Sequence, residues 1–331
     1  MPSSRWSTRG RQVLLACSAL VLQACSLLPL PLQPGAWFRP PAETMQIRLL
    51  DVAYPLLTAA APWCPFDMEP TYGLFLRDRS GESSLHGRAV VAYVHPRLPA
   101  ADAGLSVGDV ILQVNTVSVT ADSAARVGQL IDRLTRAKIQ PLQLEVLRGN
   151  ERRTLALTAV PACHYALHAL PTNLINGVTD GRRIGVTQGA LRFFSSDDEL
   201  GWILAHEIAH NILNHVQNAK LQAMLRAFLV ASGEGSDQTG PSPSSPSLEA
   251  QADYVGAYLM ALAGYDLSAI KRVWERLQRL EARQGGRKSR LAHTHPSTTA
   301  RLASLEITLR EIEARRQTGQ PLQRWFEEGG F

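Results

Sequence analysis

The chain has 331 residues, a formal net charge of +5 and an isoelectric point of about 9.2, and its length suits more than one domain. Residues 1–24 contain three arginines and no acidic residue, so they supply three of the five excess positive charges and the remainder carries a net charge of only +2. The sequence has no basic stripe interleaved with aromatic residues, which excludes nucleic acid as the expected partner.

Residues 1–24 are typical of a lipoprotein signal peptide. The arginines precede an apolar run over residues 13–24 that is too short to span a bilayer. The run leads into Leu-Gln-Ala-Cys, which resembles a bacterial lipobox with Cys25 as the lipidated residue, and Ser26 resembles an outer-membrane sorting signal. We expect a lipid-anchored protein on the periplasmic side of the outer membrane, without a transmembrane helix after Cys25. An ordinary cleaved signal peptide and an uncleaved anchor are the alternatives.

Residues 25–65 are expected to form a proline-rich tether. Five prolines lie between residues 29 and 41, and such a segment is stiff and extended. Cys64, at the end of the tether, and Cys163 bracket the next domain. An even pair of cysteines in an oxidising compartment predicts a disulfide that closes this domain, with two buried free thiols as the alternative.

Residues 66–161 resemble a PDZ domain, which implies a β-rich barrel or sandwich. The segment 99–115 combines a helical turn of small residues, a glycine stop, a Gly-Asp turn and an alternating strand. A helix over 122–136 and a hairpin with strands 142–147 and 153–160 are predicted to follow.

The segment Tyr72-Gly73-Leu74-Phe75 resembles the carboxylate-binding loop of PDZ domains. In such a loop the backbone N–H groups hold a C-terminal carboxylate while the peptide adds a strand to the sheet. The alternative is a spacer of PDZ shape whose groove is closed.

A helix with metal-ligating potential is predicted after residue 196. Ser196 and Glu199 form a capping box, and apolar residues recur at helical spacing behind it. On this helix His206 and His210, at positions i and i+4, can reach one metal ion, with Glu207 between them as a general base. The alternative is an amphipathic helix whose histidines only satisfy hydrogen bonds in the core.

A second helix is predicted to supply the third metal ligand. Ser247 can cap it, and Glu249 and Asp253 then share one face at i and i+4. Glu249 is the candidate ligand, and Asp253 the candidate acceptor for the outward N–H of a ligating histidine. A solvated acidic face is the alternative. The Gly/Ser/Pro-rich segment 233–247 is predicted to be a flexible loop between the two helices.

These two motifs together resemble metallopeptidase family 48, the gluzincins of the HtpX and CAAX prenyl protease type. Residues 183–191 resemble the hairpin before the zinc helix of that family, and His295-Pro296 with Arg301 resembles its late His-Pro element. The resemblance covers residues 165–310. One departure is Asn176-Gly177, where the family commonly has Asn-Ala.

The resemblance implies one zinc ion per chain, held by His206, His210 and Glu249, with Glu207 as general base. It implies that His295 stabilises an oxyanion or occupies the open metal position, although the nearby His293 is an alternative for this role. His215 follows His206 by nine residues, so its position on an extended helix would turn it away from the metal.

The sequence therefore predicts an α+β protein with a PDZ-like domain before a mainly α-helical zincin domain with a small sheet, the latter over residues 162–325. The expected function is a zinc metalloendopeptidase that acts on misfolded envelope proteins. A metal-containing chaperone or assembly scaffold with little proteolysis is the alternative, and a processing protease with one substrate is a third. The substrate, the cleavage specificity and the oligomeric state do not follow from the sequence.

Overall fold

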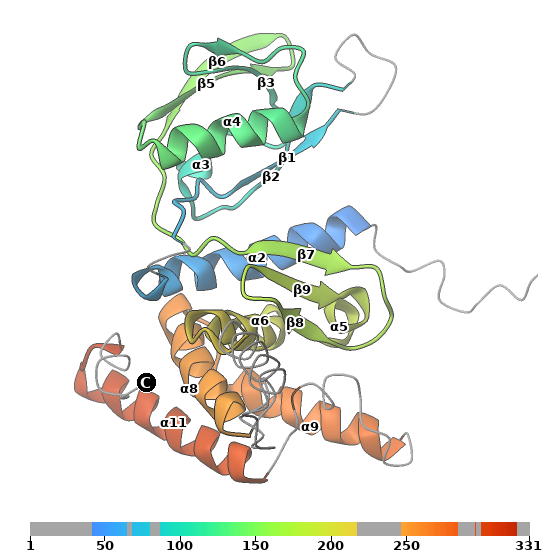
Figure 1. Ribbon diagram of the computed structural model, residues 1–331, viewed down its shortest axis with the longest axis vertical. Coiled ribbons are helices and arrows are strands. Elements are labelled where there is room, and N and C mark those ends of the chain that lie inside the picture. Colours follow the sequence, from blue (N-terminus) through green and yellow to red (C-terminus); the bar gives the residue numbers. More distant parts are fainter. Residues whose placement is uncertain are drawn as a thin grey trace, which may run out of the picture. The chain divides into compact units, whose positions relative to one another are not determined.

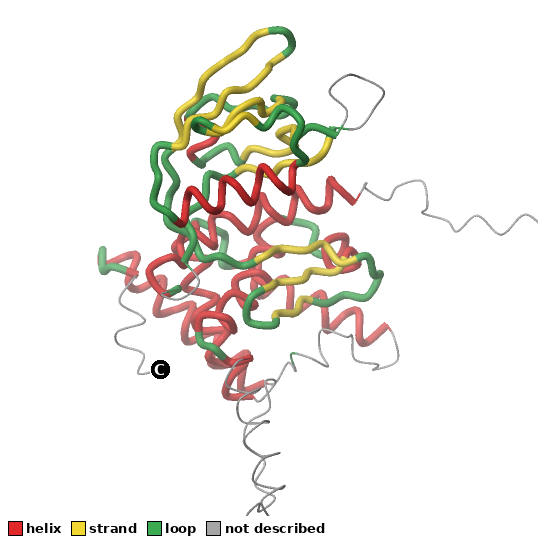
Figure 2. Tube along the Cα trace, turned by 45° about the horizontal axis from the view of Figure 1, so that its top comes forward, coloured by secondary structure: helices red, strands yellow, loops and turns green. Residues whose placement is uncertain are grey.

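The computed structural model describes residues 42–64, 68–79, 87–216, 246–283, 295 and 299–322, all of which belong to one compact unit, 42–331. The predicted signal peptide, Cys25, the proline-rich run, His293 and residues 233–245 lie outside the described residues. Figure 1 and Figure 2 show how the helices and strands are arranged.

The first described element corrects the predicted tether. Residues 42–60 form helix α2 (Ala42–Ala60), followed by a short 3-10 turn, η2 (Ala61–Trp63). Its apolar residues recur at three- and four-residue spacing, and Leu49, Ala53 and Leu56 are fully buried. This face packs against helices of the peptidase-like part of the chain. The proline-rich composition thus ends before residue 42, and the segment that follows is an amphipathic helix rather than a tether.

Residues 68–163 contain the first sheet, which is antiparallel. Its strands run in the order β1-β2-β3-β5-β6, with β4 paired to β3, and β1 lies at one edge. Helix α4 packs on this sheet, and the buried side chains of β5 alternate as Leu142, Leu144 and Val146. The elements are β1 (Leu74–Asp78), β2 (Ala89–Val94), α3 (Pro99–Asp102), β3 (Val110–Val114), β4 (Val117–Ser118), α4 (Ala124–Arg136), β5 (Leu142–Arg148) and β6 (Glu151–Leu157).

The hairpin expected at the end of this domain is present, but its second strand covers residues 151–157 instead of the predicted 153–160. The strands β5 and β6 pair from Arg148 and Glu151 outward, and Gly149 in the turn has φ of +61°, a conformation that glycine adopts without strain. The second strand ends at Leu157 rather than at residue 160 because Val160 leaves it and pairs with Thr71 instead.

Residues 166–318 form a small sheet followed by helices. In the sheet order β7-β9-β8, β7 is parallel to β9 and β8 is antiparallel to it. The predicted hairpin at 183–191 is corrected, because residues 188–193 form a helix that Thr187 caps. The elements are β7 (Ala166–Leu170), β8 (Gly177–Thr179), β9 (Arg183–Thr187), α5 (Gln188–Phe193), α6 (Asp197–Ile212), α8 (Pro246–Ala263), α9 (Ser268–Arg283) and α11 (Thr299–Thr318).

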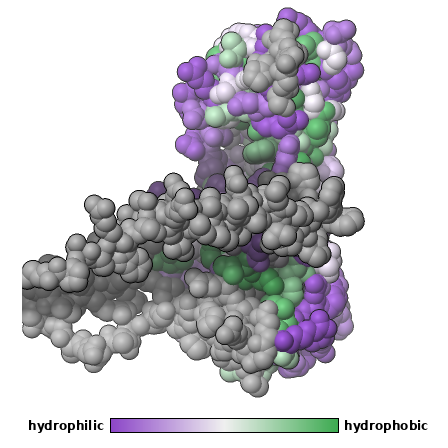
Figure 3. All heavy atoms as spheres, turned by 90° about the vertical axis from the view of Figure 1, so that its right-hand side faces the viewer, coloured by the Kyte–Doolittle hydropathy of each residue, from purple (hydrophilic) through white to green (hydrophobic). Residues whose placement is uncertain are grey.

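The architecture confirms the predicted α+β class. Helices α6, α8 and α2 pack together, and α11 and α9 extend the same core. Within the part of the chain that the structure describes, no helix is both long and apolar enough to cross a membrane. The visible surface at the top of Figure 3 is mostly hydrophilic with scattered hydrophobic residues, which is ordinary for a folded domain in water.

Cys64 and Cys163 form a disulfide with a Cα–Cα distance of 5.6 Å. The two cysteines are 99 residues apart in sequence, and the PDZ-like sheet lies between them. The bridge therefore joins the two ends of this domain, which is the pairing expected from the spacing of the two cysteines.

Candidate metal centre

Helix α6 presents the His-Glu-x-x-His motif from a firmly capped start. Ser196 Oγ accepts the N–H of Glu199 at 3.2 Å. In return Glu199 Oε2 accepts the N–H of Ser195 at 2.9 Å, one residue before the position that an ideal capping box uses. Arg276 of α9 also pairs with this carboxylate. The N-terminus of α6 is thus tied to the core before the metal-site residues begin.

Helix α8 approaches α6 closely enough to share the site. Gly256 faces α6, and a Cβ at this position would lie 3.2 Å from the backbone N of His206, so a larger residue would push the helices apart. The helix begins at Pro246, which places Ser247 in its first turn rather than before it. Glu249 and Asp253 share the face toward α6, and both are buried.

Four donor side chains meet between these helices. His206 Nε2 lies 3.1 Å from His210 Nε2, and Glu249 lies 3.3 Å from the first and 3.4 Å from the second. His295 Nδ1 joins them at 3.2 Å from His206 Nε2 and 3.1 Å from Glu249 Oε2. Each of the four side chains has one potential metal-ligand atom in this cluster, and these four atoms all lie within 4.8 Å of one another. The sequence motifs therefore converge on one point in space.

The contacts of the Nδ1 atoms of His206 and His210 determine where each ring carries its proton, and therefore whether the Nε2 atom that faces the cluster has a lone pair. His206 Nδ1 lies 3.0 Å from Asp253 Oδ1, so this nitrogen carries the proton and Nε2 carries a lone pair. His215 Nε2 donates to Gln251 Oε1 at 3.1 Å, and its Nδ1 accepts the N–H of His210 Nδ1 at 2.9 Å. Both Nε2 atoms are therefore lone-pair donors 3.1 Å apart, an arrangement that a shared cation would satisfy.

His215 was expected to point away from the metal, and the structure corrects this. Helix α6 ends at Ile212, and Asn214 has φ of +54°, which turns the chain back. The helical extrapolation from His206 therefore does not apply at residue 215. Burial lowers the pKa of His215 to about 4, which keeps the ring neutral and able to accept the N–H of His210.

Arg301 of α11 is the cation that accompanies the buried carboxylates. Its Nε and Nη2 atoms each donate to Asp253 at 2.8 Å, and Nη1 lies 3.0 Å from Glu249 Oε2. Glu207, Glu249, Asp253 and Arg301 are all at most 3% exposed. Even with the protonated His295 described below, three carboxylates outnumber the cationic side chains, so this buried group keeps a net negative charge. A buried imbalance of this kind is costly unless a cation compensates it.

These observations fit a divalent zinc ion. Tetrahedral coordination with bonds of about 2.0–2.1 Å places neighbouring ligand atoms about 3.3–3.4 Å apart, and the His206, His210 and Glu249 atoms are 3.1 to 3.4 Å apart. Two imidazoles and a carboxylate are a ligand set of catalytic zinc sites. The donor chemistry, the spacing and the charge of the site thus agree.

Glu207 lies beside the ligand set rather than in it. His295 Nε2 is 3.2 Å from Glu207 Oε1, while His295 Nδ1 faces Glu249. Burial raises the pKa of Glu207, but the nearby His295 charge outweighs burial and lowers it overall. Conversely, burial lowers the pKa of His295, and the charges of Glu207 and Glu249 raise it to about 10. In the metal-free site His295 is therefore a cation between the two carboxylates.

Gly177, where the sequence departs from the family pattern, packs against the side chain of Glu207. A Cβ at this position would lie 2.9 Å from Ile203 Cγ2 and 3.1 Å from Glu207 Oε1. The glycine therefore leaves room for the Glu207 carboxylate next to the edge strand β8.

A helix-borne His-Glu-x-x-His motif with a glutamate ligand from a second helix defines a gluzincin-class metal site. Residues 174–309 match peptidase family M48 and residues 71–158 match the PDZ domain family. The chain therefore contains a peptidase family M48 domain preceded by a PDZ domain.

A curated relative supports the same assignment. The mitochondrial metalloendopeptidase OMA1 of Schizosaccharomyces pombe is 32% identical over 180 residues, which cover 50% of this chain and 53% of the relative. The chain thus spans about half the length of the curated relative that it matches.

Solved structures that match part of this chain include the HtrA3 PDZ domain bound to a phage-derived ligand and a PDZ domain protein from Parabacteroides distasonis. The first is 22% identical and covers 29% of this chain and 88% of its own, with a TM-score of 0.25. The second is 17% identical and covers 35% of this chain and 23% of its own, with a TM-score of 0.26.

The sequence indicated the ligands, Glu207 and the orienting carboxylate Asp253, and it named Arg301 without a role, but it did not indicate the other residues that position the ligands. His215 and Gln251 hold His210, Arg301 holds Asp253 and Glu249, and Gly256 permits the close approach of α8. A histidine shortly after the helix end and a glycine inside an apolar helix were the available signals, and neither is specific without the fold.

Proposed function

We propose that the protein is a zinc-dependent endopeptidase. The observation that carries this proposal is the buried cluster of His206, His210 and Glu249 beside Glu207, in which carboxylates outnumber cationic side chains. Zinc in such a site supplies Lewis acidity toward the scissile carbonyl and lowers the pKa of water. The remaining chemistry belongs to side chains of this chain.

Glu207 is placed to move the proton. As a carboxylate it accepts a proton from the attacking water and delivers it to the leaving amine. His295, 3.2 Å from Glu207 Oε1, orients this carboxylate and provides positive charge where an oxyanion would form. Asp253 and His215 keep the ring N–H of each α6 histidine directed away from the site, which preserves the lone pairs that bind metal.

Quality control of envelope proteins is the biological role that we propose for this activity. It is supported by the lipobox-like sequence at Cys25, by a disulfide, which suits an oxidising compartment such as the periplasm, and by the PDZ domain, which suits capture of protein clients. We place the protein on the periplasmic side of the outer membrane, held by a lipid at Cys25, with misfolded envelope proteins as substrates.

Digestion of casein and of an unfolded outer-membrane protein tests the enzymatic proposal. Zinc-loaded wild type should cleave both, and the Glu207→Gln variant should lose at least a hundredfold in rate, because general base catalysis contributes about 10²–10⁴-fold. Glu306→Gln, at an exposed position on α11, is the matched control and should match the wild type. Equal digestion by wild type, Glu207→Gln and chelated protein would refute the mechanism.

The scaffold alternative predicts a different result in the same assay. A metal-containing chaperone would retain client binding while zinc-loaded wild type cleaves none of the clients. Glu207 argues against this alternative, because a purely structural zinc site has no use for a buried carboxylate beside its ligands.

A further inference from the structure

Asn211 is a buried polar residue on the zinc helix to which the proposed mechanism gives no role. It follows His210 directly, lies four residues after Glu207 on α6, and is 5% exposed. Residues at positions i and i+4 lie on one face of a helix. Asn211 is therefore on the same face as the general base, one helical turn further along.

Strand β8 runs along this face of α6. A Cβ at Gly177 would lie 2.9 Å from Ile203 Cγ2 and 3.1 Å from Glu207 Oε1. Two residues later in the strand, Thr179 Oγ1 lies 2.5 Å from Asn211 Oδ1. The three helix residues are spaced by four positions and the two strand residues by two, so each element presents one face to the other. The helix and the strand therefore stay in contact from Ile203 to Asn211.

The amide of Asn211 uses only one of its two polar atoms. The 2.5 Å between Thr179 Oγ1 and Asn211 Oδ1 suits an O–H···O hydrogen bond and is too short for N–H···O, whose range begins at about 2.7 Å. The hydroxyl is available to donate, because the Arg183 carbonyl 3.0 Å away already accepts the N–H of Asp180. Nδ2 is the remaining amide atom, and it has no hydrogen-bond partner among the described residues.

The opposite edge of the same small sheet shows how an amide with a purely structural role is satisfied. Gln46 of α2 joins that helix to β7, the other edge strand. Its Nε2 donates to Leu167 O at 3.0 Å, and its Oε1 accepts the N–H of Ala169 at 2.9 Å. Each edge strand is thus fixed to a helix by one amide. Of these two amides, the one beside the general base leaves its N–H groups unpaired.

The unpaired donor indicates that Nδ2 has a partner when the protein works. Buried polar groups of native proteins nearly all form hydrogen bonds, because an unmade bond leaves the desolvation of the group uncompensated. On the same face of α6, Glu207 Oε2 also has no hydrogen-bond partner among the described residues. For Glu207 the proposed mechanism supplies a partner, the attacking water. By the same reasoning the partner of Asn211 is part of the substrate.

A main-chain carbonyl is the substrate group that fits this donor. Four residues of helix advance by about 6 Å, and two residues of extended polypeptide advance by about 6.6–6.8 Å. An extended substrate that runs along this face with its scissile carbonyl at Glu207 therefore brings the carbonyl of a residue two positions away to Asn211. Glu207 and Asn211 are 1% and 5% exposed, so a substrate that reaches the buried general base comes within one helical turn of the buried amide.

We propose that Asn211 is a substrate-binding residue whose Nδ2 donates a hydrogen bond to a main-chain carbonyl two residues from the scissile bond. The hydrogen bond from Thr179 holds Oδ1, so that Nδ2 is the atom presented to the substrate. Every residue has a main-chain carbonyl, so this contact favours extended, unfolded polypeptide without selecting a side chain. The inference rests on the proposed peptidase function and assigns the residue that places the substrate beside Glu207.

A thioamide scan of a casein peptide tests this proposal. A quenched fluorogenic peptide is synthesised around one casein site that the zinc-loaded wild type cleaves, and each carbonyl except the scissile one is replaced singly by a thiocarbonyl, a weaker acceptor. One replacement two residues from the scissile bond should raise KM about three- to tenfold and leave kcat unchanged, because the contact is equal in ground and transition states. Asn211→Leu should raise KM for the unmodified peptide by a similar factor, and the thioamide should then add nothing.

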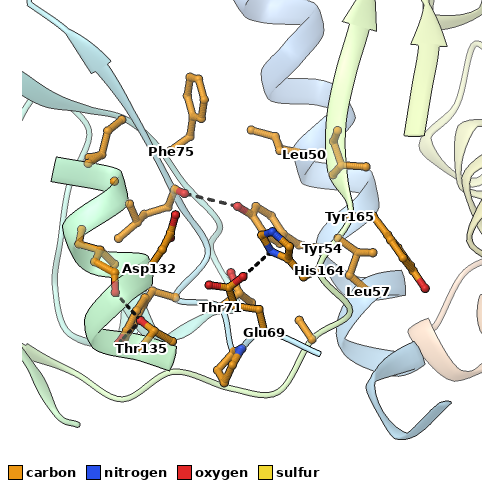
Figure 4. A pocket seen from close by; sticks show the side chains of 18 of the residues that line it. Leu50, Tyr54, Leu57, Glu69, Thr71, Phe75, Asp132, Thr135, His164 and Tyr165 are labelled. Atoms are coloured by element: carbon orange, nitrogen blue, oxygen red, sulfur yellow. Dashed lines mark hydrogen bonds and ion pairs between the residues drawn. The ribbon is translucent and has the colours of Figure 1, made fainter. Parts of the chain in front are cut away.

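Gln46→Leu is the matched control, because it removes the amide that fixes the other edge of the sheet. Gln46 lines the cavity of about 690 Å³ between α2 and the PDZ domain, which Figure 4 shows. None of the described residues that line this cavity belongs to the metal centre. KM and its response to the thioamide should therefore equal those of wild type, even where the variant is less stable.

The outcomes separate this inference from the proposed function. No casein cleavage by zinc-loaded wild type contradicts the peptidase function and the inference together. Cleavage in which Asn211→Leu and Gln46→Leu change KM equally, or in which no thioamide two residues from the scissile bond raises KM, overturns the inference alone. Asn211→Asp is the second variant if Asn211→Leu does not fold. It keeps an acceptor for Thr179 and replaces the donor by an oxygen, so it should also abolish the response to the thioamide.

Discussion

Arg301 provides the most direct test of the electrostatic account of the metal centre. Its guanidinium forms two 2.8 Å hydrogen bonds with Asp253 and a 3.0 Å ion pair with Glu249, and it lies 5.2 Å from the centroid of the Trp274 ring. The Arg301→Met substitution keeps an apolar stem over the ring and removes the charge. The two carboxylates then remain buried without their cation.

The expected loss of stability follows from this burial. Removing one partner of a buried ion pair costs about 3–5 kcal/mol, because the other charge stays desolvated. Burial raises the pKa of Asp253, but hydrogen bonds from His206 and Arg301 outweigh burial and lower it. The substitution should therefore raise the pKa of Asp253 as well. The loss should be largest in chelated protein, where zinc and the arginine are both absent and only His295 still offsets the charge of the carboxylates.

Urea-induced unfolding followed by tryptophan fluorescence measures this loss. Trp202 and Trp274 are buried in the peptidase domain, and residues 68–161 contain no tryptophan, so the signal does not come from the PDZ domain. Arg310→Met, on the exposed side of the same helix, should change stability by less than about 0.5 kcal/mol. Equal unfolding free energies for Arg301→Met and wild type in chelator would refute the reasoning.

Further predictions concern the other groups around the site. His215→Ala should weaken zinc binding about 10–100-fold, measured by competition with a chromophoric chelator, because it removes the acceptor that orients His210; the exposed His164→Ala should not. His215 has a folded-state pKa of about 4 against an ordinary 6.5. The unfolded chain therefore binds this proton first as pH falls from 6.5 toward 4. Stability of metal-free wild type should fall over that range more steeply than that of His215→Gln, by up to about 1.4 kcal/mol per pH unit in urea titrations. Replacing both Cys64 and Cys163 by serine should lower the unfolding free energy by about 4.7 kcal/mol, which is the chain-entropy value for a loop of about 100 residues. Reduction of the disulfide in wild type should have the same effect. A loss below about 1 kcal/mol would contradict this account. Chelation should abolish casein cleavage and added zinc should restore it, whereas unchanged cleavage by rigorously chelated protein would refute the zinc assignment.

The sequence by itself determined the local parts of the molecule. The capping residues and apolar spacing placed helix α6, and the i, i+4 relation put His206 and His210 on one face whatever the rest of the fold did. The same relation placed Glu249 and Asp253 together on α8. Turn residues and alternating strands placed most PDZ elements within a few residues. These features depend on neighbours in the chain, which a sequence displays directly.

Only the tertiary structure decided which distant residues meet. His215 reaches His210 because the helix ends and the chain turns back at Asn214. Arg301 comes to Asp253 and Glu249 through the packing of α11 on α8, and Gly256 sets how near α8 lies to α6. The segment 42–60, expected as part of a tether, became the helix that contacts both the PDZ domain and the zinc helix. Its apolar face has meaning only against the surfaces it covers, because burial is a property of the packed fold and not of one segment.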